Sequence, residues 1–407
     1  MKIELIIIGS ELLNGHLVER NSNFLAKKIW EKGMEISLIT IVGDKEEYVE
    51  NILKLSSSRS DIIIITGGLG PTADDITKKS LSKVFNKPLI VSEEALKNLI
   101  DENKFNISCK EQALIPEGAK LIKNKFGTAA GLIIEINNKF IIALPGVPSE
   151  MQQMSLDFVI PYISDLVKDK PKIKSKTIKF TDIFESEIDK KLSPLLQNDK
   201  QLHFSLLPDF FEVSLNLTVK AQNEIEANEK LEFYEMQCKK FFGKYIWGYD
   251  SDTMEKVVGE LLGSKNLTLS VAESCTGGLV SHKITSVPGC SKYFKGSIVA
   301  YDNSIKEKIL NILENHISSF GAVSLEVANE MSSGIRKLYM TDFGIGITGI
   351  AGPGGATSMK PLGLVYISLS TKNDVYCEKF IFDGTREQIQ NKASFKALNM
   401  LRKNLLG

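Results

Sequence analysis

From residue 3 to about residue 165, short apolar runs alternate with amphipathic stretches. The runs IELIIIG, EISLITIVG and DIIIITGG are separated by segments such as NSNFLAKKIWEKG, in which apolar residues recur at helical spacing. Apolar runs with helices on both sides of them in the sequence are typical of a parallel sheet covered on two faces. Two later runs, GLIIEI and KFIIALPG, predict further strands.

The middle of the chain changes character. Residues 168–176, KDKPKIKSK, are rich in Lys and Pro and poor in large apolar residues, which predicts a linker or an exposed strand. Residues 176–247 then read as strand, helix, strand, helix and strand, enough for a small α+β module.

A new α/β pattern opens near Ser251. The helix DTMEKVVGELLGSK precedes the strand LTLSVAE, and the later strand candidates are SIVAY, FGIGITG and LGLVYISLS. We therefore expect two three-layer α/β domains with largely parallel sheets, residues 1–168 and 250–407, joined by a small α+β module at residues 169–249.

Length and charge limit the possible functions. A chain of 407 residues is too long for one hydrophobic core. Fifty basic side chains balance fifty acidic ones, and this zero net charge argues against a nucleic-acid partner. No apolar run approaches the roughly 20 residues of a membrane helix. We expect a cytoplasmic protein with no membrane partner that forms a homodimer, the commonest soluble oligomer.

The residues that bind soft metals are scattered. Five cysteines and four histidines form no CxxC pair or cluster, so neither a disulfide framework nor a zinc site is indicated. A metal would have to be held mainly by carboxylates and phosphates, which favours a hard cation such as Mg²⁺.

The loop TGGLGPTADDIT, residues 66–77, directly follows a predicted strand. Its glycines allow backbone N–H groups to approach a ligand closely, so the loop is suited to binding an anion such as phosphate. Asp74 and Asp75 would repel phosphate unless a divalent cation lay between them. Alternatively, the two aspartates only cap the next helix.

Other glycine and acidic residues also follow predicted strands. In open parallel sheets ligands bind outside the carboxyl ends of the strands, so these loops should converge on one crevice. They are Gly9-Ser10-Glu11, Gly43-Asp44, Gly127-Thr128-Ala129, and Pro145-Gly146-Val147-Pro148 with Glu150.

A second loop, VAESCTGGLVSHKI, places Ser274 after a predicted strand and at the expected start of a helix. Such a serine is either a nucleophile or only an N-cap. Gly277 and Gly278 favour the first interpretation, because glycine in a first helical turn costs about 1 kcal/mol relative to Ala and needs another reason to be there.

Two later strand ends carry polar candidates. Tyr301, Asn303 and Lys306 follow the strand SIVAY, and Thr348 precedes the glycine-rich loop GIAGPGG. Taken singly, a tyrosine or lysine at a strand end is usually a solvated residue at the rim. Together they place a serine, a tyrosine and a lysine opposite a loop that could hold phosphate.

The N-terminal segments resemble the CinA family in order and spacing. They are GSELLNG, VGD, TGGLGPTADD, NKFGTAAG and LPGVPSEM. In that family this domain resembles molybdopterin-binding domains, and full-length members are associated with metal-dependent cleavage of the ADP-ribose pyrophosphate. The resemblance implies a cation such as Mg²⁺ or Co²⁺ at Asp44, Asp74, Asp75 and Glu150. It implies that ADP-ribose is bound by Gly67, Gly68, Gly70, Thr72, Gly127, Thr128, Pro145 and Gly146.

The C-terminal segments resemble the C-terminal domain of the same family, which is similar to the PncC nicotinamide-nucleotide amidases. They are AESCTGG, VAYDN followed by Lys306, GAVS, TGIAGPGG and KPLG. Ala356 and Leu362 stand where glycine and valine are frequent, and neither position is reactive. With a looser match through ESEIDKKL and FFEVSLNL, the whole chain resembles a full-length CinA protein. The resemblance implies deamidation of nicotinamide mononucleotide without a cofactor.

The resemblance and the local chemistry agree on a Ser–Lys mechanism. Ser274 would attack the amide carbon, and Lys306, kept neutral by burial or by the pyridinium ring, would accept its proton directly or through Tyr301. The backbone of Thr276, Gly277 and Gly278 would bind the oxyanion. Further substrate contacts are expected from Asn303, Thr348, Gly349, Ala351, Gly352 and Arg386.

The alternative is a protein that binds without catalysis. It would be an adaptor in competence or the damage response, or a molybdopterin carrier, and both loops would only hold a ligand. Release of ammonia from nicotinamide mononucleotide separates the two interpretations, because a pure binding protein cannot produce it.

Overall fold

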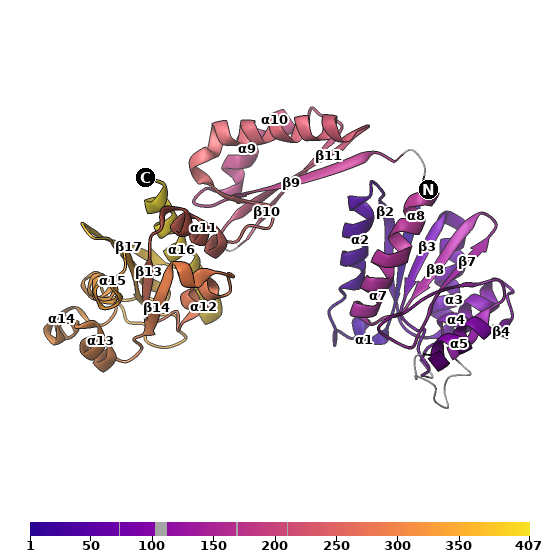
Figure 1. Cartoon of the computed structure of the whole chain (residues 1–407), viewed down its shortest axis with the longest axis horizontal. Helices are drawn as coiled ribbons and strands as arrows, with labels where there is room; N and C mark the ends of the chain where they lie inside the picture. The colour runs from indigo at the N-terminus through magenta and orange to yellow at the C-terminus, as the bar shows by residue number, and fades with distance from the viewer. Residues whose placement is uncertain (73, 102–111, 168–169, 210) are drawn as a thin grey trace. The chain divides into compact units, whose positions relative to one another are not determined.

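The computed structural model describes residues 1–72, 74–101, 112–167, 170–209 and 211–407 (Figure 1). Contacts divide it into two compact units, Met1–Lys174 with Val219–Lys230, and Ser175–Thr218 with Leu231–Gly407. Residues 73, 168, 169 and 210 of the segments quoted above, and Cys109, lie outside the described residues. No helix in the described ranges is long and apolar enough to cross a membrane.

The N-terminal domain contains a six-stranded sheet in the order β2-β1-β3-β8-β7-β6. Its strands are β1 (Ile3–Ile8), β2 (Ile36–Val42), β3 (Ile62–Thr66), β6 (Lys120–Ile122), β7 (Gly131–Ile136) and β8 (Lys139–Leu144). Its helices are α1 (Ser10–Leu13), α2 (Asn21–Glu31), α3 (Glu46–Arg59), α4 (Thr77–Val84), α5 (Glu93–Asp101), α7 (Pro148–Met154) and α8 (Ile160–Leu166), with a π-helical turn at Ser155–Val159. A separate pair consists of β4 (Leu89–Val91) and β5 (Leu114–Pro116).

Strand β1 shows why this domain has three layers. All of its residues are buried, because Leu5 and Ile7 pack into the core that contains α2, α7 and α8, whereas Ile6 and Ile8 pack into the core that contains α3 and α4. Successive side chains of a strand point to opposite faces, so a sheet covered on both faces needs a continuous apolar run. Strands β2, β1, β3 and β8 are parallel, and β7 and β6 add antiparallel pairs at one edge.

The central module is a four-stranded sheet in the order β10-β11-β9-β12. Its elements are β9 (Lys172–Phe180), α9 (Glu185–Leu196), β10 (Leu202–Pro208), β11 (Val213–Ala221), α10 (Glu224–Phe242), a 3-10 turn (Gly243–Tyr245) and β12 (Ile246–Tyr249). The predicted order lacked β10 and was wrong there. Strand β10 lies at a sheet edge and is only partly buried, although its residues LHFSL alternate between apolar and polar as a strand requires.

The C-terminal domain contains a five-stranded sheet in the order β14-β13-β15-β16-β17. Its strands are β13 (Leu269–Glu273), β14 (Phe294–Val299), β15 (Phe343–Gly349), β16 (Leu364–Ser370) and β17 (Val375–Ile381). Its helices are α11 (Met254–Lys265), α12 (Leu279–Thr285), α13 (Asn303–Leu310), α14 (Glu314–Phe320), α15 (Leu325–Tyr339) and α16 (Arg386–Leu406), with a 3-10 turn at Cys290–Lys292. The predicted strands lacked β17, an exposed edge strand that carries Glu378 and Lys379.

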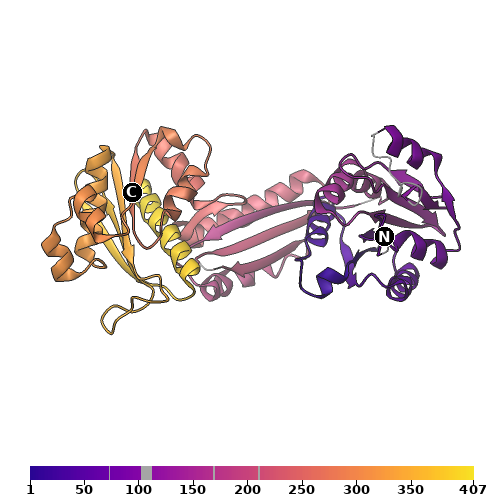
Figure 2. The ribbon, with the colours of Figure 1, turned by 90° about the horizontal axis from the view of Figure 1, so that it is seen from below.

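Helices cover both faces of the C-terminal sheet (Figures 1 and 2). Helices α11, α12 and α16 contribute to one buried core, and α13, α14 and α15 contribute to the other. Strands β14, β13 and β15 are parallel, while β16 and β17 are antiparallel to their neighbours. The predicted α/β class with largely parallel sheets is confirmed.

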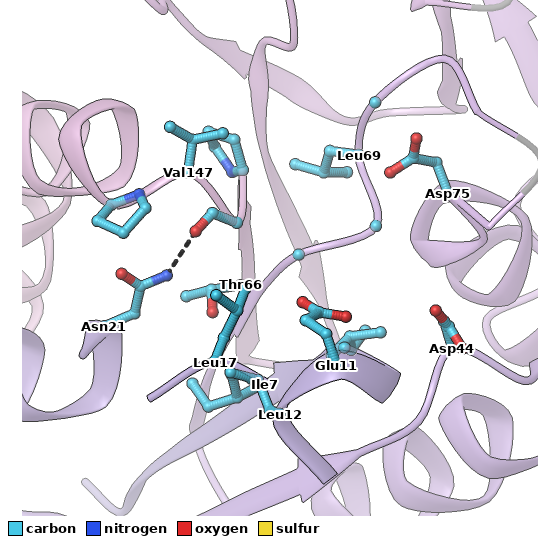
Figure 3. Close-up of a pocket in the computed structure, with 18 of the residues that line it drawn as sticks. Ile7, Glu11, Leu12, Leu17, Asn21, Asp44, Thr66, Leu69, Asp75 and Val147 are labelled. Carbon is cyan, nitrogen blue, oxygen red and sulfur yellow. Dashed lines mark hydrogen bonds between the residues drawn. The ribbon is translucent and has the colours of Figure 1, made fainter. Parts of the chain in front are cut away.

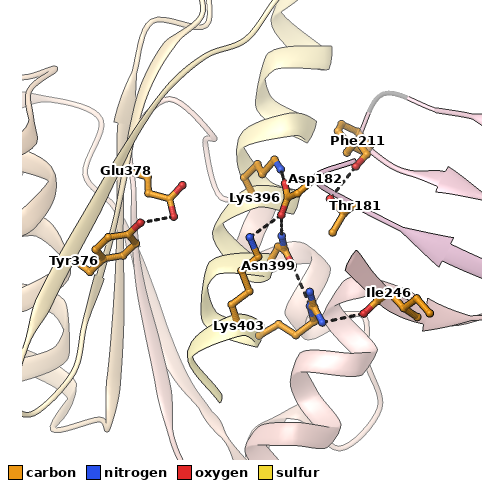
Figure 4. Close-up of polar contacts among 10 residues, drawn as sticks. Thr181, Asp182, Phe211, Ile246, Tyr376, Glu378, Lys396, Asn399 and Lys403 are labelled. Atoms are coloured by element: carbon orange, nitrogen blue, oxygen red, sulfur yellow. Dashed lines mark hydrogen bonds and ion pairs between the residues drawn. The ribbon is translucent and has the colours of Figure 1, made fainter. Parts of the chain in front are cut away.

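The module contacts helix α16 through a charged cluster and an aromatic one. Asp182 receives hydrogen bonds from Lys396 and from Asn399, the latter at 3.1 Å, and pairs with Lys403 at 2.7 Å (Figure 4). Burial alone would raise the pKa of Asp182, but the two lysines hold it below its usual value. Phe211 and Phe395 stack with ring centroids 5.2 Å apart.

Glu4 on β1 is a fully buried carboxylate. Its oxygens accept hydrogen bonds from the hydroxyls of Ser56 and Ser60, both at 2.7 Å, and from Arg59 at 2.6 and 3.1 Å. Burial would raise the pKa of Glu4, but these partners hold it below its usual value. The cluster joins the amino-terminal end of β1 to the C-terminal end of α3, at the opposite end of the strand from Gly9.

We predict that Glu4→Gln lowers the free energy of unfolding of the N-terminal domain by about 2–4 kcal/mol, because it places an amide donor among donors. Hydrogen exchange of β1 amides in increasing urea measures the loss. The solvated pair Lys28–Glu31 supplies the control, since Glu31→Gln should change stability by less than about 0.5 kcal/mol. The difference in stability between the Glu4→Gln variant and the unmutated protein should hold above about pH 4.3 and shrink as the pH falls through the lowered pKa of Glu4. A difference in stability that does not change with pH would contradict the prediction.

Candidate functional site

The first candidate site is a cavity of about 920 Å³ at the carboxyl ends of β1, β3 and β8 (Figure 3). Gly9, Gly67 and Pro145 directly follow these strands, and all three line the cavity. Of the residues predicted for this site, Thr72 and Gly127 are not part of the lining. The predicted residues that line it are Asp44, Gly67, Gly68, Gly70, Asp74, Asp75, Thr128, Pro145, Gly146 and Glu150.

The glycine loop needs glycine for its own shape. Gly67 and Gly68 have φ angles of 102° and 67°, which side chains rarely adopt. A Cβ atom on Gly68 would lie 2.5 Å from the hydroxyl of Thr77, and one on Gly67 would overlap the carbonyl oxygen of Ile8. The tight turn brings this backbone to the surface of the cavity.

Asp75 does not cap helix α4. The helix begins at Thr77 and has no side-chain cap, so the capping interpretation is wrong. Asp75 instead accepts hydrogen bonds from the Thr72 amide at 2.8 Å and from its hydroxyl at 2.5 Å. Asp75 therefore closes the turn of its own loop, and Thr72 serves this turn. Asp74 is exposed.

The remaining carboxylates of the cavity are oriented by neighbours. The Ser10 hydroxyl donates to Asp44, and Asn124 donates to Glu150 at 2.6 Å. Glu11 also lines the cavity, on the same side as Asp44 and Asp75 in Figure 3. Sequence reasoning noted Glu11 at a strand end but assigned it no role. Its signal was the same as that of Asp44, an acidic residue just after a strand-end glycine.

The donor set fits a divalent cation that binds together with its substrate. The acidic side of the cavity offers only oxygen ligands, which suit Mg²⁺. Within the described ranges, no group of three His, Cys, Asp or Glu side chains is placed to hold an ion. Mg²⁺ is commonly bound by one or two carboxylates together with substrate phosphates. The carboxylates that line the cavity could contribute such ligands only together with a bound phosphate.

The second candidate site lies at the end of β13. Ser274 is buried and follows Glu273, and its amide donates to Ile347 on β15 at 3.0 Å. The parallel register pairs Glu273 with Val299 on one side and with Ile347 on the other. Ser274, Ala300 and Thr348 each come directly after one of these paired residues. The segment that leads to Tyr301 therefore lies on one side of Ser274, and Thr348 lies on the other.

Ser274 is not at the start of a helix, so that prediction was wrong. A tight turn occupies residues 274–278, and helix α12 begins at Leu279. Gly277 and Gly278 have φ angles of 62° and 97°, which no right-handed helix contains. The two glycines delay the helix, and Ser274 cannot be its N-cap.

Glu273, which sequence reasoning missed, holds this turn. Its carboxylate is fully buried and accepts from the amides of Gly278 and Val280 at 3.1 Å, and from the amide and hydroxyl of Ser281 at 2.9 and 2.5 Å. It therefore caps the first turn of α12 across a five-residue gap. The only available signal was an acidic residue at the end of a buried strand.

These bonds narrow the choice of oxyanion donor. The Gly278 amide is bound by Glu273, and the Gly277 amide donates to the Ser274 carbonyl at 3.1 Å. The expectation that both would serve as donors is wrong for this conformation. Among the described residues the Thr276 amide donates no hydrogen bond, so of the three predicted donors it is the one that remains for a ligand.

Lys306 is an enclosed amine. The residue is 1% exposed, and Nζ donates to the Tyr301 carbonyl at 3.0 Å. Burial lowers the pKa of Lys306, and the opposing pull of Asp302 does not cancel this effect. The Tyr301 side chain is exposed, and its hydroxyl accepts from Arg386 at 3.1 Å. The predicted route for a proton through the Tyr301 hydroxyl is therefore not formed in this conformation.

The remaining predicted residues have mixed roles. Arg386 donates to the Gly352 carbonyl at 2.6 Å, which ties α16 to the glycine loop of Gly349, Ala351 and Gly352. The Thr348 hydroxyl donates to the Ala322 carbonyl at 2.7 Å, so this hydroxyl hydrogen is used in a structural hydrogen bond. Asn303 is exposed at the start of α13.

Two neighbours of Ser274 were not predicted from the sequence. Gln390 on α16 donates to the Cys275 carbonyl at 2.8 Å and holds the turn from outside. Burial raises the pKa of Cys275 to about 12, so its thiol stays protonated near neutral pH. A thiol that stays protonated is a weak nucleophile.

Comparison with known proteins covers almost the whole chain. Three family models match: "Probable molybdopterin binding domain" over residues 4–165, "Damage-inducible protein CinA KH domain" over 175–248 and "CinA C-terminal domain" over 251–405. A competence-damage inducible protein of Caldicellulosiruptor saccharolyticus is 42% identical over 414 residues, with all of both chains covered. A CinA-like protein of Dictyoglomus thermophilum is 39% identical over 411 residues, again with all of both chains covered.

Among solved structures, the protein CinA of Thermoplasma acidophilum, described as having unknown function, is 28% identical. The match covers 41% of this chain and 98% of that one, with a TM-score of 0.38.

We predict that Lys306→Met raises the free energy of unfolding of the C-terminal domain by roughly 1 kcal/mol at pH 7, because it removes an amine whose charged form burial disfavours. The folded pKa of Lys306 lies below its unfolded value, so the folded protein binds fewer protons. The stability of the unmutated domain should therefore rise with pH towards about 10.4, and the advantage of the variant should shrink.

Thermal unfolding of both proteins from pH 6 to 10 measures this difference. Lys308→Met, on the exposed face of the same helix, is the matched control and should change little. A Lys306→Met protein less stable than the unmutated one would show that the amine stabilises the fold.

Proposed function

Because the chain belongs to the CinA family, we propose that its C-terminal domain hydrolyses the carboxamide of nicotinamide mononucleotide. The observation that carries the proposal is that Ser274 and Lys306 follow the neighbouring parallel strands β13 and β14, and that Lys306 is an enclosed amine whose pKa is lowered by burial and affected by Cys275, the residue next to Ser274. Clustering of a buried titratable group with a candidate nucleophile is typical of catalytic sites.

The reaction would proceed in two covalent steps. The Ser274 oxygen attacks the carboxamide carbon, and neutral Lys306 accepts the hydroxyl proton. The C–N bond then breaks, and Lys306 returns this proton to the leaving ammonia. Water attacks the resulting ester, Lys306 again accepts a proton, and nicotinate mononucleotide leaves as Ser274 regains its hydrogen.

The backbone and Arg386 would position the substrate. The Thr276 amide is the proposed donor to the oxyanion, since the amides of Gly277 and Gly278 are already bound. The positive pyridinium ring of the substrate would further favour neutral Lys306. Arg386 reaches both Tyr301 and Gly352, which suits a contact to the substrate phosphate beside the glycine loop.

For the N-terminal domain we propose metal-dependent cleavage of the ADP-ribose pyrophosphate. The supporting observation is one cavity with a glycine loop and carboxylates around it. A bound divalent cation would neutralise pyrophosphate charge at the carboxylates. Asp44 and Asp74 are the proposed cation ligands, and Asp75 keeps the loop closed around them. The loop amides and the Thr128 hydroxyl would hold the phosphates.

The alternative, a domain that only binds, is favoured by its match to a molybdopterin-binding model. Mass spectrometry after incubation with ADP-ribose and Mg²⁺ or Co²⁺ separates the two. Formation of AMP and ribose 5-phosphate supports the hydrolase, and recovery of intact ADP-ribose with every cation supports the binding protein.

We predict that Ser274→Ala abolishes ammonia release from nicotinamide mononucleotide while the fold is kept. Lys306→Met should have the same effect, and the double variant should be little worse than either single one, because the two residues act as a unit. Ser286→Ala, an exposed serine at the C-terminal end of α12, is the control. If Ser274→Ala kept more than about a tenth of kcat, roughly 1.4 kcal/mol of barrier, the covalent mechanism would be excluded.

We predict that Asp74→Asn removes ADP-ribose cleavage and leaves the amidase activity unchanged. Asp74 is exposed, whereas Asp75 holds the loop, so Asp74→Asn separates chemistry from loop structure. Asp165→Asn, an exposed aspartate of α8 outside the cavity, is the control. AMP release and ammonia release are measured on the same preparations, and simultaneous loss of both activities would instead indicate damage to folding.

A further inference from the structure

The cavity of the N-terminal domain has an apolar wall away from its acidic side. Leu17 and Val147 lie on the side of Figure 3 opposite Asp44 and Asp75. Leu17 is 59% exposed, and its neighbour Val18, which also lines the cavity, is 79% exposed. Large apolar side chains gathered at the mouth of one cavity indicate a surface that a ligand covers.

The polar groups within this wall are already used or covered. Asn21 donates through Nδ2 to the Gly146 carbonyl at 2.8 Å. The side-chain oxygen of Asn21 and the Thr66 hydroxyl each expose less than 1 Å² and have no partner among the described residues. The Gly67 amide donates to Leu144, and its carbonyl accepts from Thr77.

Three further polar side chains from the segment that carries Leu17 also line the cavity. Glu19 accepts hydrogen bonds from the amides of Asn21 and Ser22 at 2.7 and 2.9 Å. His16 and Arg20 line the cavity and are exposed to solvent. Groups at a solvated rim can exchange a ligand for water with little change in free energy, so they discriminate weakly between ligands.

We propose that this wall holds the nucleobase of the pyrophosphate substrate by apolar contact alone. The domain would then accept nucleoside diphosphate sugars as a class, and not only those with adenine. The inference rests on the pyrophosphatase activity proposed above for this cavity. It adds that the phosphates lie at the carboxylates and the glycine loop, while the flat base covers Leu17, Val18 and Val147.

The chemistry of the wall determines the selectivity. A site that hydrogen-bonds a ligand rejects an analogue without the matching group by a factor of about 10⁴ or more, because its own buried groups are left unpaired. An apolar pocket discriminates by only about 10- to 200-fold against a ligand that lacks one methylene, and about as weakly against one that adds a hydroxyl. The affinity of the wall should therefore depend on whether the ligand has a base, and only weakly on which base it is.

Binding of monophosphates to the full-length protein tests the proposal. Isothermal titration in Mg²⁺ compares AMP, GMP and UMP with ribose 5-phosphate, which has no base. We expect the three nucleotides to bind within about tenfold of each other, and each at least tenfold more tightly than ribose 5-phosphate. An AMP affinity equal to that of ribose 5-phosphate, or more than about 100-fold above those of GMP and UMP, would overturn the proposal.

Leu17→Ser assigns this binding to the wall. The substitution should lower the affinity for all three nucleotides to that for ribose 5-phosphate, and it should leave the affinity for ribose 5-phosphate unchanged. Leu13→Ser is the matched control, because Leu13 is 58% exposed on the same segment and does not line the cavity. Nucleotide binding that survives Leu17→Ser would lie elsewhere, for example in the C-terminal domain, and would contradict the proposed subsite.

The same proteins separate this proposal from the hydrolase on which it rests. If ADP-ribose is cleaved, Leu17→Ser should raise KM about tenfold or more with kcat nearly unchanged, since the base lies away from the reacting phosphates. If ADP-ribose is not cleaved but the monophosphates bind as expected, the proposed pyrophosphatase activity is wrong and the proposed binding of the nucleobase by the wall is supported.

Discussion

Parallel strand pairing brings loops that are far apart in the sequence to one edge of each large sheet. In the C-terminal domain, Glu273 pairs with Val299 and Ile347, so the segments that follow all three meet. In the N-terminal domain, β1, β3 and β8 end together beneath a single cavity. Parallel neighbours point the same way and need crossover helices, which leaves their carboxyl ends free to carry loops. Without this pairing, neither set of polar residues would form a site.

Two buried charged residues of the C-terminal domain illustrate opposite uses of burial. Glu273 accepts hydrogen bonds from three amides and a hydroxyl, which satisfies its charge and fixes the turn. Lys306 has one described bond, to a neutral carbonyl, and its pKa is lowered by burial. A satisfied charge stabilises structure, whereas an unsatisfied one is easily converted to its neutral, basic form. This contrast, and not burial as such, separates the positioning residue from the proposed base.

Helix α16 serves the proposed amidase site and the central module together. Near its start, Arg386 and Gln390 contact the Gly352 loop and the Ser274 turn. Farther along, Phe395 and Lys396 contact Phe211 and Asp182 of the module. A helix of 21 residues spans about 30 Å as one stiff element. The module therefore braces the same helix that holds the loops around Ser274, which gives it a structural role in the second unit.

The sequence by itself determined the three-layer class, because continuous apolar runs separated by amphipathic helices allow few other arrangements. It also placed Ser274 and Lys306 in segments that follow strands. Only the tertiary structure decided which neighbours these residues have. The turn before α12, the cap provided by Glu273 and the bond from Arg386 to Tyr301 depend on left-handed glycines and on contacts between distant segments. Periodicity reports which face of an element is buried, but a hydrogen-bond partner is set by where another part of the chain packs.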